Sequence, residues 1–138
     1  MPIMKSAGAV IFRRENNEIK YLLIKYGWGH WEFPRGGIEK GESIEETAKR
    51  EIREETGIED VNFVKGFKEW IKFFFKQEGE NIMKIATFLL AETKTEEIRL
   101  SHEHDDYLWL NYEDALEKLT FDNSKKIIEK AHDFLSKK

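Results

Sequence analysis

The stretch Gly36-Gly-Ile-Glu-Lys-Gly-Glu42-Ser43-Ile-Glu-Glu46-Thr-Ala-Lys-Arg50-Glu51-Ile52-Arg53-Glu54-Glu55-Thr-Gly57-Ile58 decides how this chain folds. It reads as a glycine turn followed by a helix. Ser43 and Glu46 have the spacing of a capping box, so the helix is expected to begin just after Ser43. Gly57 is the residue expected to end it. The stretch therefore predicts a helix of about 13 residues.

This helix carries an unusual group of charges. Glu51, Glu54 and Glu55 stand at positions i, i+3 and i+4, so their side chains are expected to converge on one face. Three anions at that spacing repel one another unless a positive charge lies among them, and a hard divalent cation such as Mg²⁺ prefers carboxylate oxygens. Arg50 is placed to brace one carboxylate with two hydrogen bonds. The alternative is a solvated, charge-rich helix face.

Composition limits the remaining possibilities. A chain of 138 residues, 40% of them hydrophobic, is expected to form one domain spanning residues 1–138. The absence of cysteine excludes disulfides and thiolate metal sites. No apolar run is long enough for a membrane span and no leader is evident, so a cytoplasmic location is expected. The net charge of −4 argues against long nucleic acid as the main partner and leaves a small phosphorylated ligand open.

The rest of the chain predicts a sheet with helices on both sides. Residues 6–14 and 21–26 are expected to form a buried pair of strands, followed by a loop at 27–37. Residues 61–75 and 82–91 are expected to form an antiparallel pair, and 107–110 a short final strand. Residues 112–119 and 123–135 have helical periodicity.

The opening stretch also fits a longer pattern, G-x5-E-x7-R-E-U-x-E-E-x-G-U, where U is aliphatic. This pattern resembles the signature of the Nudix hydrolases. The resemblance implies an α/β (α+β) fold, the family's α/β/α sandwich around a mixed β-sheet. The chain matches every fixed position: Gly36, Glu42, Arg50, Glu51, Ile52, Glu54, Glu55, Gly57 and Ile58.

Three flanking stretches resemble one branch of that family, the asymmetrically cleaving diadenosine tetraphosphate (Ap4A) hydrolases. They are A-G-A-V-I-F-R-R at 7–14, W-E-F-P-R-G at 31–36, and E-I-R-L-S-H-E-H at 97–104 with Y-L-W-L at 107–110. The branch implies Mg²⁺-dependent hydrolysis of a dinucleoside polyphosphate, diadenosine tetraphosphate to ATP and AMP, by a metal-activated water. The alternatives are a nucleoside triphosphate or RNA 5′-end pyrophosphohydrolase, and a non-catalytic nucleotide-binding module, which usually loses glutamates that this chain keeps.

The resemblance also implies a metal site with two or more ions, Mg²⁺ or Mn²⁺ in its place. Glu51 and Glu55 match the main ligands, Glu54 a further or water-bridged ligand, and the carbonyl of Gly36 another oxygen. Glu103 matches a glutamate that family members bring to the metals from a distant loop. Clustered cations activate water and neutralise phosphate charge. The general base stays open between Glu54, Glu55 and Glu103.

Substrate contacts follow from the same resemblance. Arg35 and Lys84 match phosphate-binding positions, although Lys84 also reads as a surface lysine on a strand. Phe73 stands where relatives have a tyrosine, so it can stack on a base but lacks the hydroxyl for a phosphate hydrogen bond. Arg50 completes the set of candidate catalytic residues as the brace of the helix carboxylates.

Two histidines flank the candidate glutamate of the late loop. His102 and His104 are expected either to contact phosphate or to hold the loop that carries Glu103. The expected partner is a small nucleotide, with no long nucleic acid and no membrane. A monomer and a homodimer are both compatible with the sequence.

Overall fold

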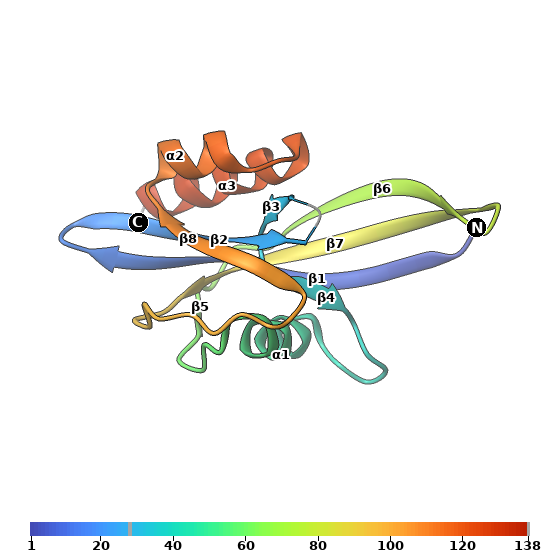
Figure 1. Cartoon of the computed structure of the whole chain (residues 1–138), viewed down its shortest axis with the longest axis horizontal. Coiled ribbons are helices and arrows are strands. Elements are labelled where there is room, and N and C mark those ends of the chain that lie inside the picture. The colour runs from blue at the N-terminus through green and yellow to red at the C-terminus, as the bar shows by residue number, and fades with distance from the viewer. Residues whose placement is uncertain (28, 138) are drawn as a thin grey trace.

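Helices cover both faces of one mixed eight-stranded sheet in the computed structural model, which describes residues 1–27 and 29–137 (Figure 1). Helix α1 lies on one face, and α2 and α3 lie on the other. This arrangement confirms the predicted sandwich. The elements are β1 (Ile3–Glu15), β2 (Glu18–Tyr26), β3 (Trp31–Glu32), β4 (Arg35–Gly37), α1 (Ile44–Thr56), β5 (Asn62–Phe63), β6 (Glu69–Gln77), β7 (Glu80–Glu92), β8 (His104–Leu110), α2 (Tyr112–Lys118) and α3 (Asp122–Ser136).

Strand β1 lies at the centre of the sheet and contributes side chains to both halves of the core. It pairs antiparallel with β2 and parallel with β7. Side chains alternate across a strand, so Ile11 packs with Ile52 of α1 while Phe12 packs with Ile128 of α3. All four of these side chains have at most 1% of their surface exposed. The long apolar run of β1 is therefore a strand buried on both faces, as its sequence predicts.

Helix α1 has the predicted bounds. Ser43 Oγ accepts a hydrogen bond from the Glu46 amide at 3.1 Å, and Glu46 Oε1 accepts one from the Ser43 amide at 2.8 Å. Both hydrogen bonds of the capping box are present, so the backbone N–H groups of Ser43 and Glu46 are both satisfied at the start of the helix. Gly57 ends the helix in the left-handed region at φ 78° and donates its N–H to the carbonyl of Arg53.

The loop expected at 27–37 is partly wrong. It contains two short strands, β3 and β4, and Trp28 lies outside the described residues. The last strand also begins earlier than predicted, at His104. The antiparallel pair expected at 61–75 and 82–91 is confirmed as β6 and β7, with Gln77 opposite Glu80 at the turn, but β6 begins at Glu69 and Asn62–Phe63 form the separate strand β5. Both late helices are confirmed, and no helix among the described residues has the length and apolar character to cross a membrane.

Strands β3 and β4 fill a wedge between β1 and β2. The two long strands stay paired from their turn to Phe12 and Tyr21 and then separate. Ile24 of β2 pairs with Glu32 of β3, on the edge opposite to its β8 partner, while Gly8 of β1 pairs with Arg35 of β4. The wedge thus places Glu32 and Arg35 in the middle of the sheet.

Close contact between β1 and the wedge requires glycine at position 8. A Cβ there would lie 2.1 Å from the carbonyl oxygen of Pro34, a backbone atom that cannot rotate away. We expect Gly8→Ala to lower the free energy of unfolding by about 2–3 kcal/mol, because the wedge must shift to admit the methyl group. Urea unfolding followed by circular dichroism measures this.

Gly37→Ala is the matched control for that variant. Gly37 belongs to the same ladder, opposite Ser6, and a Cβ there meets no atom of the described chain within 4 Å. Equal stability of the Gly8 and Gly37 variants would contradict the proposed close contact.

Candidate active site

Arg50 ties the loop before α1 to the carboxylates of the helix. Its Nε and one terminal nitrogen donate to the two carboxylate oxygens of Glu42 at 2.7 and 3.0 Å. The same terminal nitrogen reaches the carbonyl of Gly37 at 2.9 Å. The other donates to Glu51 at 2.7 Å and to Glu54 at 3.1 Å. The bidentate contact is therefore to Glu42 of the loop, whereas Glu51 and Glu54 of the helix each accept a single hydrogen bond. The hydrogen bonds from Arg50, followed by the backbone hydrogen bond from Glu39, lower the pKa of Glu42 to about 2.

Glu51 and Glu55 come together beside Gly36. A Cβ on Gly36 would lie 2.1–2.3 Å from the carboxylate atoms of Glu51, so only glycine lets the backbone approach this closely. Glu55 is 6% exposed, and its Oε1 has no hydrogen-bond partner among the described residues. Burial, then the hydrogen bond and charge of Glu51, raise the pKa of Glu55 well above its usual range.

These donors fit a hard divalent cation. Glu51 and Glu55 supply oxygens, and Glu55 Oε1 is a buried oxygen that accepts no hydrogen bond from any residue that the structure describes. A cation between the two carboxylates would relieve the repulsion that a proton relieves in its absence. The backbone of Gly36 lies against the Glu51 carboxylate, and its carbonyl stays the further oxygen ligand that the sequence predicts.

Glu54 and Glu103 lie farther out than the sequence suggests. The Glu54 side chain is 53% exposed and held by Arg50, and Glu103 lies on an exposed turn before β8. The charge of Glu103 still contributes, after burial and Glu51, to the raised pKa of Glu55. Across the part of the chain that the structure describes, no three histidine or acidic side chains form a ready metal cluster. The five-residue ligand set remains a prediction.

His104 anchors the turn that carries Glu103. Its ring is buried, with Nδ1 2.9 Å from Ser101 Oγ and Nε2 3.7 Å from Glu55 Oε1. The ring meets Tyr26 edge-on at 4.4 Å between centroids. These contacts favour the loop-holding role over direct phosphate contact for this histidine.

Arg35 and Lys84 face a common hollow of about 320 Å³, here called the cationic pocket. Lys84 is half-buried, and burial followed by the charge of Arg35 lowers its pKa. The pairing of two cations in one hollow argues against Lys84 as an ordinary surface lysine. The other residues that line the cationic pocket are Ser6, Tyr26, His30, Glu32, Gly36 and Phe121.

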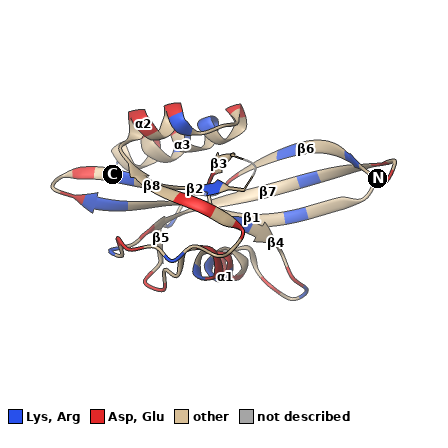
Figure 2. Cartoon of the chain, viewed as in Figure 1, with Lys and Arg blue, Asp and Glu red and all other residues tan. Residues whose placement is uncertain are grey.

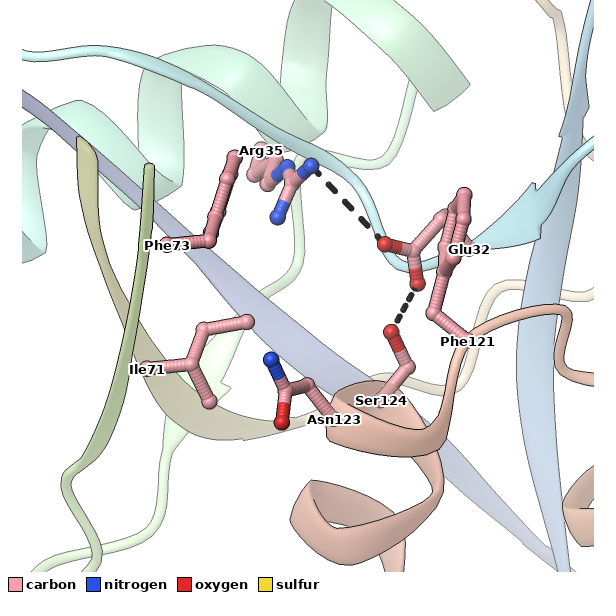
Figure 3. A pocket seen from close by; sticks show the side chains of 7 residues that line it. All are labelled: Glu32, Arg35, Ile71, Phe73, Phe121, Asn123 and Ser124. Atoms are coloured by element: carbon pink, nitrogen blue, oxygen red, sulfur yellow. Dashed lines mark hydrogen bonds and ion pairs between the residues drawn. The ribbon is translucent and has the colours of Figure 1, made fainter. Parts of the chain in front are cut away.

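A second hollow of about 260 Å³, the aromatic pocket, adjoins the first (Figure 3). Arg35 links the two, because its guanidinium lies 5.8 Å from the ring centre of Phe73 and 3.8 Å from Glu32 Oε2. Ser124 donates a hydrogen bond to the other oxygen of Glu32. The residues that line this pocket are Glu32, Arg35, Ile71, Phe73, Phe121, Asn123 and Ser124.

Sequence reasoning missed Glu32 and Phe121, which line both pockets. Glu32 is 4% exposed, and burial raises its pKa against the opposing effects of Arg35 and Ser124. The sequence offers one signal for Glu32, namely an acidic residue two positions before Pro34. Its partner Ser124 is 92 residues away, and no local pattern connects the two.

Comparison with known proteins agrees with this geometry. Residues 2–131 match the NUDIX domain family. The chain is 36% identical to the asymmetrical bis(5′-nucleosyl)-tetraphosphatase of Mus musculus, over 96% of this chain and 95% of that protein. It is 38% identical to an RNA pyrophosphohydrolase of Bartonella bacilliformis, over 56% of this chain and 50% of that protein.

A solved structure gives the same assignment. The crystal structure of a C. elegans Ap4A hydrolase binary complex superposes with a TM-score of 0.86 at 28% identity, covering 98% of this chain and 99% of that one. The match of family, near-complete length and fold leads to one conclusion. The chain belongs to the Nudix hydrolase family.

Proposed function

We propose that this Nudix hydrolase cuts diadenosine tetraphosphate asymmetrically, to ATP and AMP, with Mg²⁺ or Mn²⁺ as cofactor. The observation that carries the proposal is the 36% identity to an asymmetrical tetraphosphatase over nearly the whole of both chains. The arrangement of the pockets supports it. The aromatic pocket, the cationic pocket and the paired carboxylates follow one another and share Arg35 and Gly36 as links.

The pockets match the parts of a nucleotide. A base fits between the hydrophobic side chains of the aromatic pocket, with Phe73 and Phe121 as ring surfaces. Arg35 and Lys84 bind and orient the phosphates that follow. This order directs the polyphosphate toward Gly36 and the adjoining carboxylates, where the anhydride bond is cut.

Cleavage requires an attacking water, a proton acceptor and positive charge at the phosphate oxygens. A divalent cation held by Glu51, Glu55 and the carbonyl of Gly36 would activate the water and neutralise the phosphate charge. Glu54, Glu55 and Glu103 are the candidate proton acceptors. Arg50 acts through Glu51 by fixing the orientation of its carboxylate.

A second candidate is pyrophosphate removal from RNA 5′ ends. It is favoured by the 38% identity to an RNA pyrophosphohydrolase, which covers about half of each chain. Both activities use the same carboxylates, so the substrate distinguishes them and the metal site does not.

Product analysis tests the proposal directly. With Mg²⁺ and diadenosine tetraphosphate in ¹⁸O-labelled water, we expect ATP and AMP, with the label in one of them identifying the attacked phosphorus. Removal of the cation with EDTA is expected to stop the reaction, and Mg²⁺ to restore it. Two ADP molecules would indicate a symmetric cut and reject the assignment. An intact dinucleotide together with pyrophosphate released from triphosphorylated RNA would support the second candidate.

Substitution of the paired carboxylates tests the catalytic site. We expect Glu51→Gln and Glu55→Gln each to lower kcat by more than about 100-fold, because each removes an anionic oxygen donor. Glu45→Gln is the control, since Glu45 is exposed on the first turn of the same helix. Steady-state kinetics at saturating Mg²⁺ measures the effect. Unchanged turnover in both site variants would reject the metal-site assignment.

Gly36 offers a test that leaves every carboxylate in the chain. We expect Gly36→Ala to lower kcat by about 100-fold, because the added methyl group displaces the Glu51 carboxylate. The cost in folding free energy is expected to stay below about 1 kcal/mol, since the displaced group ends a flexible side chain. Gly37→Ala, whose Cβ meets no described atom within 4 Å, is expected to retain turnover. Equal activity of the two variants would contradict the proposed packing.

A further inference from the structure

Strand β6 carries a stripe of alternating lysines and aromatic rings on the face opposite to the aromatic pocket. The stripe consists of Lys68 and the residues that follow at every second position, Trp70, Lys72, Phe74 and Lys76. All five are exposed, and the two rings each show 58% of their surface. Rings of this size are normally buried in the core or an interface, so their exposure in alternation with cations calls for an explanation.

The register of the sheet extends the stripe onto neighbouring strands. Lys72 pairs with Ile85 of β7, and Ile85 pairs with Lys5 of β1, so the three side chains form one row across the face. Figure 2 shows basic residues on β6 and β1 in the part of the sheet that extends past α1, whereas the basic residue of β7 is Lys84, which lines the cationic pocket instead. The acid Glu69 belongs to the alternate set and binds Lys130 of α3 at 3.0 Å. All charged residues of the stripe are therefore lysines.

The lysines of this face are not neutralised by ion pairs within the described chain. Within the described residues, no carboxylate forms an ion pair with Lys5, Lys68, Lys72 or Lys76. Nor is the outer edge of β6 covered, since in the described chain it pairs with β7 alone. Both the charges and the rings are open to a ligand.

A hollow of about 420 Å³ lies beside Trp70. It is bounded by Ile44 at the start of α1, Ile85 of β7, and two cations, Lys5 and Lys68. An apolar floor with a ring on one side and ammonium groups at the rim matches a planar base attached to phosphate. Phe74 stands four residues along the same strand, about 13 Å away, with Lys72 between the two rings.

We propose that this stripe binds a single-stranded nucleic acid segment, with bases stacked on Trp70 and Phe74 and phosphates at the intervening lysines. Sequence-tolerant stacking on rings, combined with backbone cations, is how proteins hold single strands. The net charge of −4 does not oppose it, because the positive charge is local to this face. The stripe is separate from the pockets of the proposed hydrolysis, so its ligand does not depend on the identity of that substrate.

Fluorescence anisotropy with a labelled 5′-hydroxyl oligouridylate in EDTA tests the proposal without engaging hydrolysis. We expect salt-sensitive binding that Trp70→Ala weakens about tenfold. Lys72→Ala is expected to weaken binding and to reduce the slope of log affinity against log salt by about 0.7. Trp70→Tyr and Lys72→Arg should retain most of the affinity, since each keeps the ring or the charge.

Lys126→Glu is the charge control, because Lys126 is exposed on α3, on the other side of the sheet. This variant should bind like the unmodified protein. Circular dichroism and dinucleotide hydrolysis, both expected to be unchanged in the Trp70 and Lys72 variants, establish that the fold is intact.

Three outcomes would overturn the proposal. The first is no binding of the oligouridylate, and the second is binding that both stripe variants retain. The third is concentration-dependent self-association, seen by sedimentation and lost in the same variants, without oligouridylate binding. That result would assign the stripe to contact between copies of the chain through the open edge of β6.

Discussion

The guanidinium of Arg50 is the interaction on which the candidate active site depends. Its hydrogen bonds reach Glu42 and the carbonyl of Gly37 on the loop, and Glu51 and Glu54 on the helix. Without a cation at that point, three carboxylates and a backbone carbonyl would repel one another. With it, the loop is bound to the second turn of the helix, and the carboxylate of Glu51 is fixed against the backbone that precedes the loop.

The separation of β1 and β2 provides the second constraint. Paired along their whole length, the two strands would leave no room between them for Glu32 and Arg35. Because β1 and β2 separate, the short strands β3 and β4 of the wedge enter the sheet, and Gly36 lies on β4. The cationic pocket, the aromatic pocket and the buried carboxylates therefore meet at one place, although they come from distant parts of the chain.

Local interactions explain which features could be predicted from the sequence. The capping box and Gly57 define both ends of α1 within a few residues of themselves, so its bounds were predictable. The apolar runs and alternation of the long strands were similarly visible, although β6 was expected from residue 61 and begins at Glu69. The pairings of β3 and β4 were not, because two or three residues carry no periodicity and pair only with strands already in place. The spacing of the helix carboxylates predicts a shared face but not the capture of Glu54 by Arg50.

The parallel pairing of β1 with β7 bears on how the chain acquires its fold. Ile3 lies opposite Met83 and Phe12 opposite Glu92, so the central strand is synthesised long before its principal partner. Until β7 emerges, β1 can pair only with β2 and the short β4, and the edge that β7 covers stays open. Contacts between such distant residues slow folding and prolong the exposure of aggregation-prone surface. Because of this topology, the open edge of β1 stays without its parallel neighbour in the nascent chain until β7 has been made.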